Sequence, residues 1–242
     1  MGRRFAFPYC LAVTQQTKIT ELRRFAAGLR RIIERMALVD APTEELATAA
    51  DAAAAFADRM DEEFPKRRSW YEAAETAVGE ITDIPASAES RIENGFFDRS
   101  PIVGLSNPLA APLALAMAQE DGRRVVVGHV EFNAAYEGPP GNVHGGMVAA
   151  AWDEVLGMAQ SLSGQAGFTG TLTIRYRSPT PLYEPLVFRA WVDRVEGRKI
   201  FVSGRCHAGE RLTSEAEGIF ITVDRTKFEQ LLEERRAKPQ TG

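Results

Sequence analysis

The residues of this chain that could do chemistry gather in one apolar segment, residues 144–162. Gly145 and Gly146 stand at its start, and glycines at the start of a helix leave backbone N–H groups open to the oxyanion that forms when a carbonyl is attacked. Asp153 lies inside the segment, beside Glu154, with no basic residue within one helical turn. Because an unpaired carboxylate is costly to bury, Asp153 faces a cleft, is paired from elsewhere, or acts as a general base.

Each feature also has a structural interpretation, and other sites are weaker. Helices often begin with glycine, and Asp153 and Glu154 together could form a solvated stripe. Cys206 and His207 are adjacent on a predicted strand, so their side chains point to opposite faces and cannot form a nucleophile–base pair. The sequence contains neither a serine-hydrolase elbow nor a phosphate-binding loop.

The spacing within the segment limits how these groups can work together. His144 and Asp153 are nine positions apart, which is about 14 Å along a helix and on roughly opposite faces. Gly145 and Gly146 are only slightly closer to Asp153, so one carbonyl cannot touch both ends of one helix. A functional site therefore requires the glycines of one chain to meet Asp153 of another, which predicts a dimer with two sites across its interface.

The segment itself should be a buried helix inside a sheet. It is apolar almost all round, and Gly138-Pro-Pro-Gly141 prevents the helix from starting before His144. Around it the apolar residues recur with a period of two, which predicts about six strands. These strands fall near residues 113–118, 125–132, 171–176, 186–191, 200–207 and 212–222. The predicted fold class is α+β, an antiparallel sheet wrapped around a central helix.

The first hundred residues have a helical period instead. Apolar residues recur at helical spacing over 20–38, with Thr20 as the expected N-cap, and again from Thr43, the expected cap of a second helix. The first helix is basic and the second acidic, which favours an antiparallel hairpin over 20–63. We divide the chain into a helical extension with a linker (1–100), a sheet domain (101–225) and a C-terminal tail (226–242).

Composition excludes several classes of protein. The 242 residues carry a formal net charge of -4, so a general attraction for nucleic acid is not expected. Two cysteines and three histidines without ligand spacing argue against a disulfide scaffold or a metal site and fit a reducing, cytoplasmic location. An apolar run after Arg3 and Arg4 weakly suggests a secretory signal, but Pro8 interrupts it. A membrane span is not expected, because the sequence contains no run of about 18 consecutive apolar residues.

Three sequence motifs resemble those of a known family. They are YEGPPGNVHGG (136–146) with Asp153 nine residues after His144, TGTLTIRYRSP (169–179) and VEGRK (195–199). Together they resemble the hotdog-fold acyl-coenzyme A thioesterases, most closely the branch related to human thioesterase superfamily members and the phenylacetate-pathway thioesterases. The resemblance covers residues 101–224 and leaves the helical extension out.

The resemblance implies a role for each site residue. Asp153 would be the base or the nucleophile, the amide of Gly145 or Gly146 would polarise the thioester carbonyl, and Thr169 would position water. His144 would orient the loop. Several relatives have Asn six residues before this His, where the present chain has Gly138, so that polarisation would rest on the helix amides alone.

The resemblance also implies what the protein binds and how it assembles. It implies a homodimer or a dimer of dimers acting on acyl-CoA, without a metal or a cofactor. Arg175 and Arg177 share one strand face, and Arg198 and Lys199 lie in the next hairpin. We expect these four to bind the phosphates of coenzyme A, although they could simply be solvated charges.

The expected activity is hydrolysis of an acyl-CoA thioester to a free acid and coenzyme A. The alternative is a non-catalytic acyl-CoA sensor or regulator with DNA-binding N-terminal helices, against which the acidic second helix argues. A hotdog dehydratase is a third option, but its usual His with a later acidic partner is not seen in that spacing. The identity and length of the acyl group cannot be read from the sequence.

Overall fold

One six-stranded antiparallel sheet forms the centre of the structure. The computed structural model describes residues 8–64, 97–165, 167–222 and 234. The strands are β1 (Ala114–Glu120), β2 (Arg123–Val130), β3 (Gly167–Tyr176), β4 (Leu186–Glu196), β5 (Lys199–Ala208) and β6 (Arg211–Thr222). Their order across the sheet is β1-β2-β4-β5-β6-β3, and every neighbouring pair is antiparallel. All six strands that the period of two predicts are present, with some ends shifted by a few residues.

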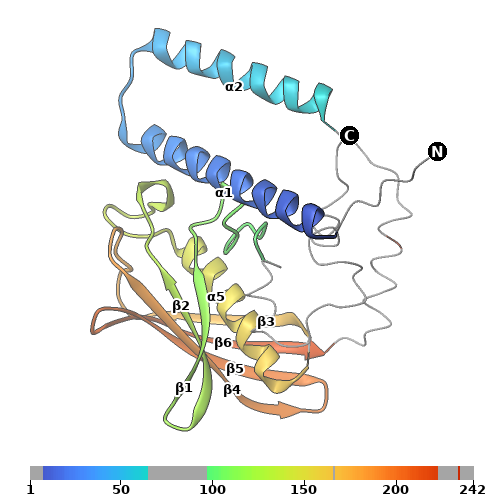
Figure 1. Cartoon of the computed structure of the whole chain (residues 1–242). Helices are drawn as coiled ribbons and strands as arrows, with labels where there is room; N and C mark the ends of the chain where they lie inside the picture. Colours follow the sequence, from blue (N-terminus) through green and yellow to red (C-terminus); the bar gives the residue numbers. More distant parts are fainter. Residues whose placement is uncertain (1–7, 65–96, 166, 223–233, 235–242) are drawn as a thin grey trace, which may run out of the picture.

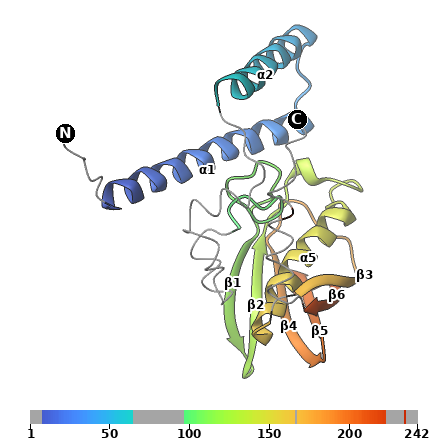
Figure 2. The ribbon, with the colours of Figure 1, turned by 90° about the vertical axis from the view of Figure 1, so that its right-hand side faces the viewer.

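The helix α5 (Gly145–Gln160) lies across one face of this sheet (Figures 1 and 2). Trp152 is fully buried between the helix and the sheet, where its Nε1 donates a hydrogen bond to Ser214 Oγ at 2.9 Å. A Cβ atom at Gly204 of β5 would lie 2.5 Å from the Trp152 ring, so only glycine lets the helix approach so closely. The predicted sheet wrapped around a central helix is confirmed.

The two edges of the sheet are formed by β1 and β3. The residues of β3 are mostly exposed in the single chain, and among the described strands only β6 pairs with it. An edge strand presents unpaired N–H and C=O groups that can pair with another strand. The strand β3 is therefore a surface on which a second chain could continue the sheet.

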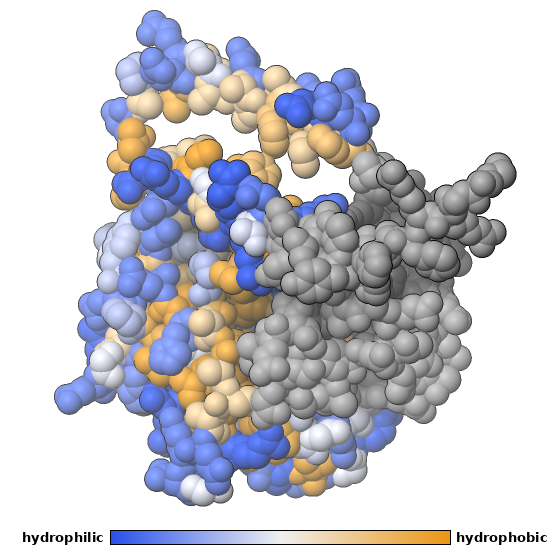
Figure 3. All heavy atoms as spheres, viewed as in Figure 1, coloured by the Kyte–Doolittle hydropathy of each residue, from blue (hydrophilic) through white to orange (hydrophobic). Residues whose placement is uncertain are grey.

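Two helices precede the sheet domain, α1 (Pro8–Leu38) and α2 (Thr43–Glu63), and they run in opposite directions in both views (Figures 1 and 2). The rings of Phe25 and Phe56 join them, with centroids 5.5 Å apart. No residue of α2 is buried, and a gap separates it from α1 over part of their length (Figure 3). The two helices form an antiparallel hairpin over 8–63, a longer range than the expected 20–63, and they are not closely packed.

Both predicted N-caps are wrong. The first helix starts at Pro8 rather than after Thr20, because no glycine or proline interrupts residues 9–27. The polar stretch 14–18 carries no apolar period, and this hid the earlier turns. Thr43 is the first helical residue of α2, its N-cap is Pro42, and no side chain caps that end.

The described parts of the chain contain no helix that combines the length and the apolar character needed to cross a bilayer. Residues 1–7, with the arginines of the possible signal, lie outside the described residues. So do most of the linker before residue 97 and, apart from residue 234, the tail 226–242. The division into 1–100, 101–225 and 226–242 stays a prediction.

Candidate active site

The start of α5 offers one open backbone amide. The Gly146 N–H donates to Nδ1 of His144, the N-cap residue, at 3.0 Å, so the His144 side chain holds the helix start as expected. The Gly145 N–H has no partner among the described residues, and the Gly145 carbonyl accepts from the hydroxyl of Tyr176 at 2.8 Å. Of the two predicted amides, that of Gly145 is the one free to receive an oxyanion.

The loop before α5 explains why a glycine stands at position 138. A Cβ atom there would lie 2.7 Å from Cα of His144 and 3.2 Å from its N atom. An asparagine in that place would displace the backbone that leads into the helix. This loop therefore fits Gly138 and excludes an asparagine side chain at that position.

Asp153 and Thr169 are brought together by an irregularity in β3. Thr169 pairs with Phe220 of β6 and Thr171 with Ile219, so Gly170 is an extra residue in the strand, a β-bulge. The bulge turns the Thr169 side chain to the α5 side of the sheet, where its Oγ1 donates to Oδ1 of Asp153 at 2.9 Å. Thr169 and Thr171 do not share a face, as a regular strand would require.

Asp153 is exposed in the single chain, so it is not the buried carboxylate of the helix. Its neighbour Glu154 takes that place: it is half-buried, and its Oε1 accepts from Oγ of the buried Ser100 at 2.9 Å. Burial raises the pKa of Glu154, the Ser100 hydrogen bond opposes this rise, and Asp153 adds to it. Sequence reasoning missed this role, because the sequence alone does not show which of two adjacent acids on a buried helix turns inward.

One half of the candidate site lies at the start of α5 and the other near the middle of the helix. Asp153 is eight positions after Gly145, about 12 Å along the helix axis. Gly146, Ala150, Asp153 and Gly157 form one stripe of small or polar residues on the accessible side of the helix, and each is exposed or half-buried. One chain thus holds the carboxylate with its hydroxyl partner and, separately, the open amide.

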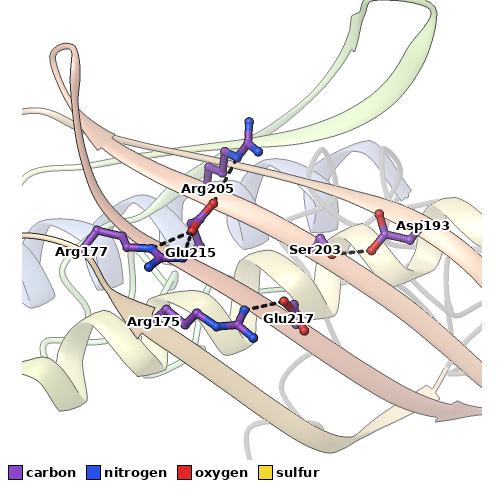
Figure 4. A network of polar contacts seen from close by, with 7 residues as sticks. All are labelled: Arg175, Arg177, Asp193, Ser203, Arg205, Glu215 and Glu217. Carbon is purple, nitrogen blue, oxygen red and sulfur yellow. Dashed lines mark hydrogen bonds and ion pairs between the residues drawn. The ribbon is translucent and has the colours of Figure 1, made fainter.

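The predicted phosphate-binding arginines are ion-paired on the opposite face of the sheet (Figure 4). Arg175 Nη1 lies 2.5 Å from Glu217 Oε1, and Arg177 Nη2 lies 2.7 Å from Glu215 Oε2. In the hairpin after β4, Arg198 Nη2 donates to the carbonyl of Thr222 at 3.1 Å. Lys199 opens β5 and is exposed. The structure joins Arg175 and Arg177 to carboxylates but does not bring the four cations together into one cluster.

Other chemistry finds no support within the described residues. They hold no group of three or more His, Cys, Asp and Glu side chains placed to bind a metal ion. Cys206 is buried in the core, and burial raises the pKa of its thiol to about 11, so it is a packing residue and not a thiolate nucleophile.

Comparison with known proteins gives consistent matches. The family model of the thioesterase superfamily matches residues 140–215, which include Gly145, Asp153 and Thr169. The acyl-coenzyme A thioesterase THEM4 of Bos taurus is 39% identical over 93 residues, 38% of each chain. The acyl-coenzyme A thioesterase THEM5 of Homo sapiens is 33% identical over 89 residues, 36% of each. The chain thus spans little more than a third of the length of these relatives.

One solved structure extends the similarity beyond the motifs. The crystal structure of a thioesterase superfamily protein superimposes with a TM-score of 0.65 at 30% identity, covering 83% of this chain and 94% of the other. The antiparallel sheet around α5 is the hotdog fold that the motifs predict. With this coverage and identity, the chain belongs to the thioesterase superfamily.

Proposed function

We propose that this protein hydrolyses an acyl-CoA thioester to a free acid and coenzyme A. The observation that carries the proposal is the Asp153 carboxylate, exposed on a largely apolar helix and hydrogen-bonded to Thr169. A carboxylate held by a hydroxyl on an accessible face is suited to take a proton from water or to attack a carbonyl. The names of the THEM4 and THEM5 relatives support acyl-CoA as the substrate.

In this reaction each group has one task. A water molecule held by Thr169 attacks the thioester carbonyl while Asp153 takes its proton, and the Gly145 N–H stabilises the oxyanion. The tetrahedral intermediate then expels the thiolate of coenzyme A, which takes up a proton as the free acid leaves. In the alternative, Asp153 itself attacks and expels the thiolate, and water hydrolyses the mixed anhydride so formed.

The proposed reaction needs two chains, arranged as a homodimer or a dimer of dimers. The open amide and the carboxylate of one α5 are about 12 Å apart, so each site takes Asp153 and Thr169 from one protomer and Gly145 from its partner. The exposed edge strand β3 carries Thr169 and offers unpaired backbone groups to a second β3. Pairing along this edge would bring the two candidate half-sites into one interface.

Coenzyme A would be held by the arginines of β3 and the β4–β5 hairpin. Arg175 and Arg177 are paired with carboxylates in the free chain, but exposed ion pairs contribute little free energy. A phosphate group can therefore replace Glu217 or Glu215 as the partner at small cost. Arg198 and Lys199 would complete this phosphate-binding surface.

We also propose that the enzyme acts in the cytoplasm.

Thiol release across a panel of acyl-CoA esters tests the activity directly. The panel includes aromatic, medium-chain and long-chain acyl groups, and the best substrate is then used with Asp153→Asn and Thr169→Val. Loss of the base should lower kcat by about 10²–10⁴-fold, and loss of the hydroxyl should have a smaller effect. The thermal midpoints of the variants verify that they fold.

The matched control is Asp193→Asn. Asp193 accepts hydrogen bonds from Trp191 and Ser203 on the opposite face of the sheet (Figure 4), so its replacement should leave kcat within about twofold. Hydrolysis that survives in Asp153→Asn within a few-fold would reject the assignment. Binding of acyl-CoA without any thiol release would favour the non-catalytic sensor.

A further inference from the structure

A short segment, residues 97–110, lies between α1 and the sheet domain and makes non-covalent contacts with both. We call it the bridging segment. On the side of α1, Arg23 Nη2 forms an ion pair with Asp98 Oδ1 at 2.8 Å. About two helical turns further along, Nη1 of Arg30 donates to the carbonyls of Leu105 and Asn107 at 3.1 and 2.8 Å. The long helix α1 thus contacts the bridging segment at Asp98 and again at Leu105 and Asn107.

Hydrogen bonds within the bridging segment hold it in a compact loop. The amide of Gly104 donates to the Ser100 carbonyl at 3.0 Å, that of Ser106 donates to the Asp98 carbonyl at 2.8 Å, and the Ser106 hydroxyl donates to the Asp98 carboxylate. A Cβ atom at Gly104 would lie 2.5 Å from the carbonyl oxygens of Asp98 and Ser100. A displacement at one end of such a compact loop is therefore passed to the other.

On its other side the bridging segment reaches both halves of the candidate site. Near the carboxylate, the Ser100 hydroxyl donates to Glu154, the residue next to Asp153. Near the open amide, the Leu109 carbonyl accepts from the Tyr136 hydroxyl at 3.2 Å, and the Tyr136 carbonyl accepts from the His144 N–H at 2.8 Å. His144 is the N-cap of α5 and immediately precedes Gly145.

Arg30 also acts on Tyr136 through its charge. Burial raises the pKa of the Tyr136 hydroxyl, and the nearby Arg30 guanidinium opposes this rise. The helix α1 packs against the short 3₁₀ turn Ala134–Tyr136. Arg30 thus contacts the bridging segment by hydrogen bonds, and its charge reaches Tyr136, the residue that holds the backbone leading into α5.

We propose that Arg30 and Ser100 are positioning residues of the active site, through which α1 fixes the Gly145 amide and the Asp153 carboxylate. The proposal rests on the proposed thioesterase function, and it assigns the N-terminal extension a role in the reaction. Neither residue need touch substrate. Arg30 acts through Leu109, Tyr136 and His144, and Ser100 acts through Glu154.

Such residues should affect kcat more than KM. A small misplacement of an oxyanion donor or a base weakens interactions made in the transition state and leaves substrate binding largely intact. We expect Arg30→Met, which keeps the apolar stem and removes the donors, to lower kcat by roughly 3–30-fold with KM within about twofold. Arg30→Lys retains donors for the carbonyls and should recover most of the rate.

The experiment compares full-length Arg30→Met, Arg30→Lys and Ser100→Ala with a matched control, Arg31→Met. Arg31 is the exposed neighbour on the same helix, so its variant loses the same charge without contacting the bridging segment. Steady-state rates are combined with amide hydrogen exchange over residues 142–148, 150–156 and 200–207. Exchange reports how well the backbone amides of each segment are protected, and it does not require activity.

In Arg30→Met, exchange should rise over 142–148, and in Ser100→Ala over 150–156, while the β5 peptide 200–207 and Arg31→Met stay unchanged. The proposal is overturned if both variants match Arg31→Met in kcat and exchange, or if the loss in kcat appears equally in Arg31→Met. If Arg30→Met does not fold, Ser100→Ala and the partial loss in Arg30→Lys decide in the same way. If the unmodified protein shows no thioesterase activity, the exchange result still tests the coupling, so the two failures are distinguishable.

Discussion

Two helices of this protein, α5 and α2, are both rich in alanine and larger apolar residues, yet their surroundings differ completely. Half of the α5 residues are buried under the sheet, including Trp152, Val155 and Leu156. None of the α2 residues is buried, and Leu46, Phe56 and Met60 remain 44–54% exposed. Helices in proteins owe most of their stability to tertiary packing, so α5 is fixed by its own domain and α2 is not.

The difference separates two kinds of role along one chain. The sheet domain closes its core within a single chain, and α1 is joined to it by specific ion pairs and hydrogen bonds at Arg23 and Arg30. The contact of α2 with α1 includes the aromatic pair of Phe25 and Phe56. The two helices of the N-terminal extension thus differ. The helix α1 is bonded to the segment that contacts the site, whereas α2 lies at the periphery of the extension.

Truncating one apolar side chain in each helix should give the largest contrast. Leu156→Ala removes a fully buried side chain in α5 and should lower the free energy of unfolding by about 2–5 kcal/mol. Phe56→Ala removes a side chain that is 44% exposed in α2 and should cost no more than about 1 kcal/mol. Urea denaturation of the two variants measures both values. Equal losses would show that α2 is as well packed as α5.

A smaller effect should come from the polar residue that α5 buries. Burial is the main cause of the raised pKa of Glu154, so the folded state binds its proton more tightly than the unfolded chain does. Its stabilising contribution is complete below the ordinary carboxyl value of 4.5 and is lost as pH rises through the raised pKa.

Glu154→Gln should therefore gain stability relative to the unmodified protein as pH rises from about 4 to 7. The measurement is urea denaturation at several pH values. Glu62→Gln, on the exposed helix α2, controls for the loss of one negative charge. A Glu154→Gln difference that stays constant or reverses with pH would contradict the burial argument.

The sequence predicts most of the fold because its two periods are clear. The period of two reveals the six strands, and an apolar segment bounded by Gly138-Pro-Pro-Gly141 reveals α5. The start of α1 is different, since its first turns carry no apolar period and only the absence of glycine and proline indicates them. Which of Asp153 and Glu154 turns inward depends on Ser100, more than fifty residues away in the chain, and no local pattern contains that contact.

The roles of the predicted site residues stay predictions, but the structure brings some of these residues together. His144 caps α5, and Thr169 donates a hydrogen bond to Asp153. That contact depends on a bulge at Gly170, which follows from the register of β3 against β6 and not from the sequence of β3 alone. For the same reason, Glu215 and Glu217 could not be predicted as partners of Arg177 and Arg175. The sequence also does not show which of the Gly145 and Gly146 amides is open, because this depends on the direction of the His144 side chain, which accepts from Gly146.

The most direct measurement is complementation between two inactive variants, Asp153→Asn and Gly145→Val. The nearest atoms to a Cβ atom at Gly145 belong to the Tyr176 ring and hydroxyl, at 3.5 Å or more, so the valine should be accommodated while it shields the amide. If each site combines Asp153 of one protomer with Gly145 of its partner, a mixed dimer keeps one intact site, and an equal mixture should regain about a quarter of the unmodified activity. A mixture that forms mixed dimers but is no more active than its two components would contradict a site shared between chains.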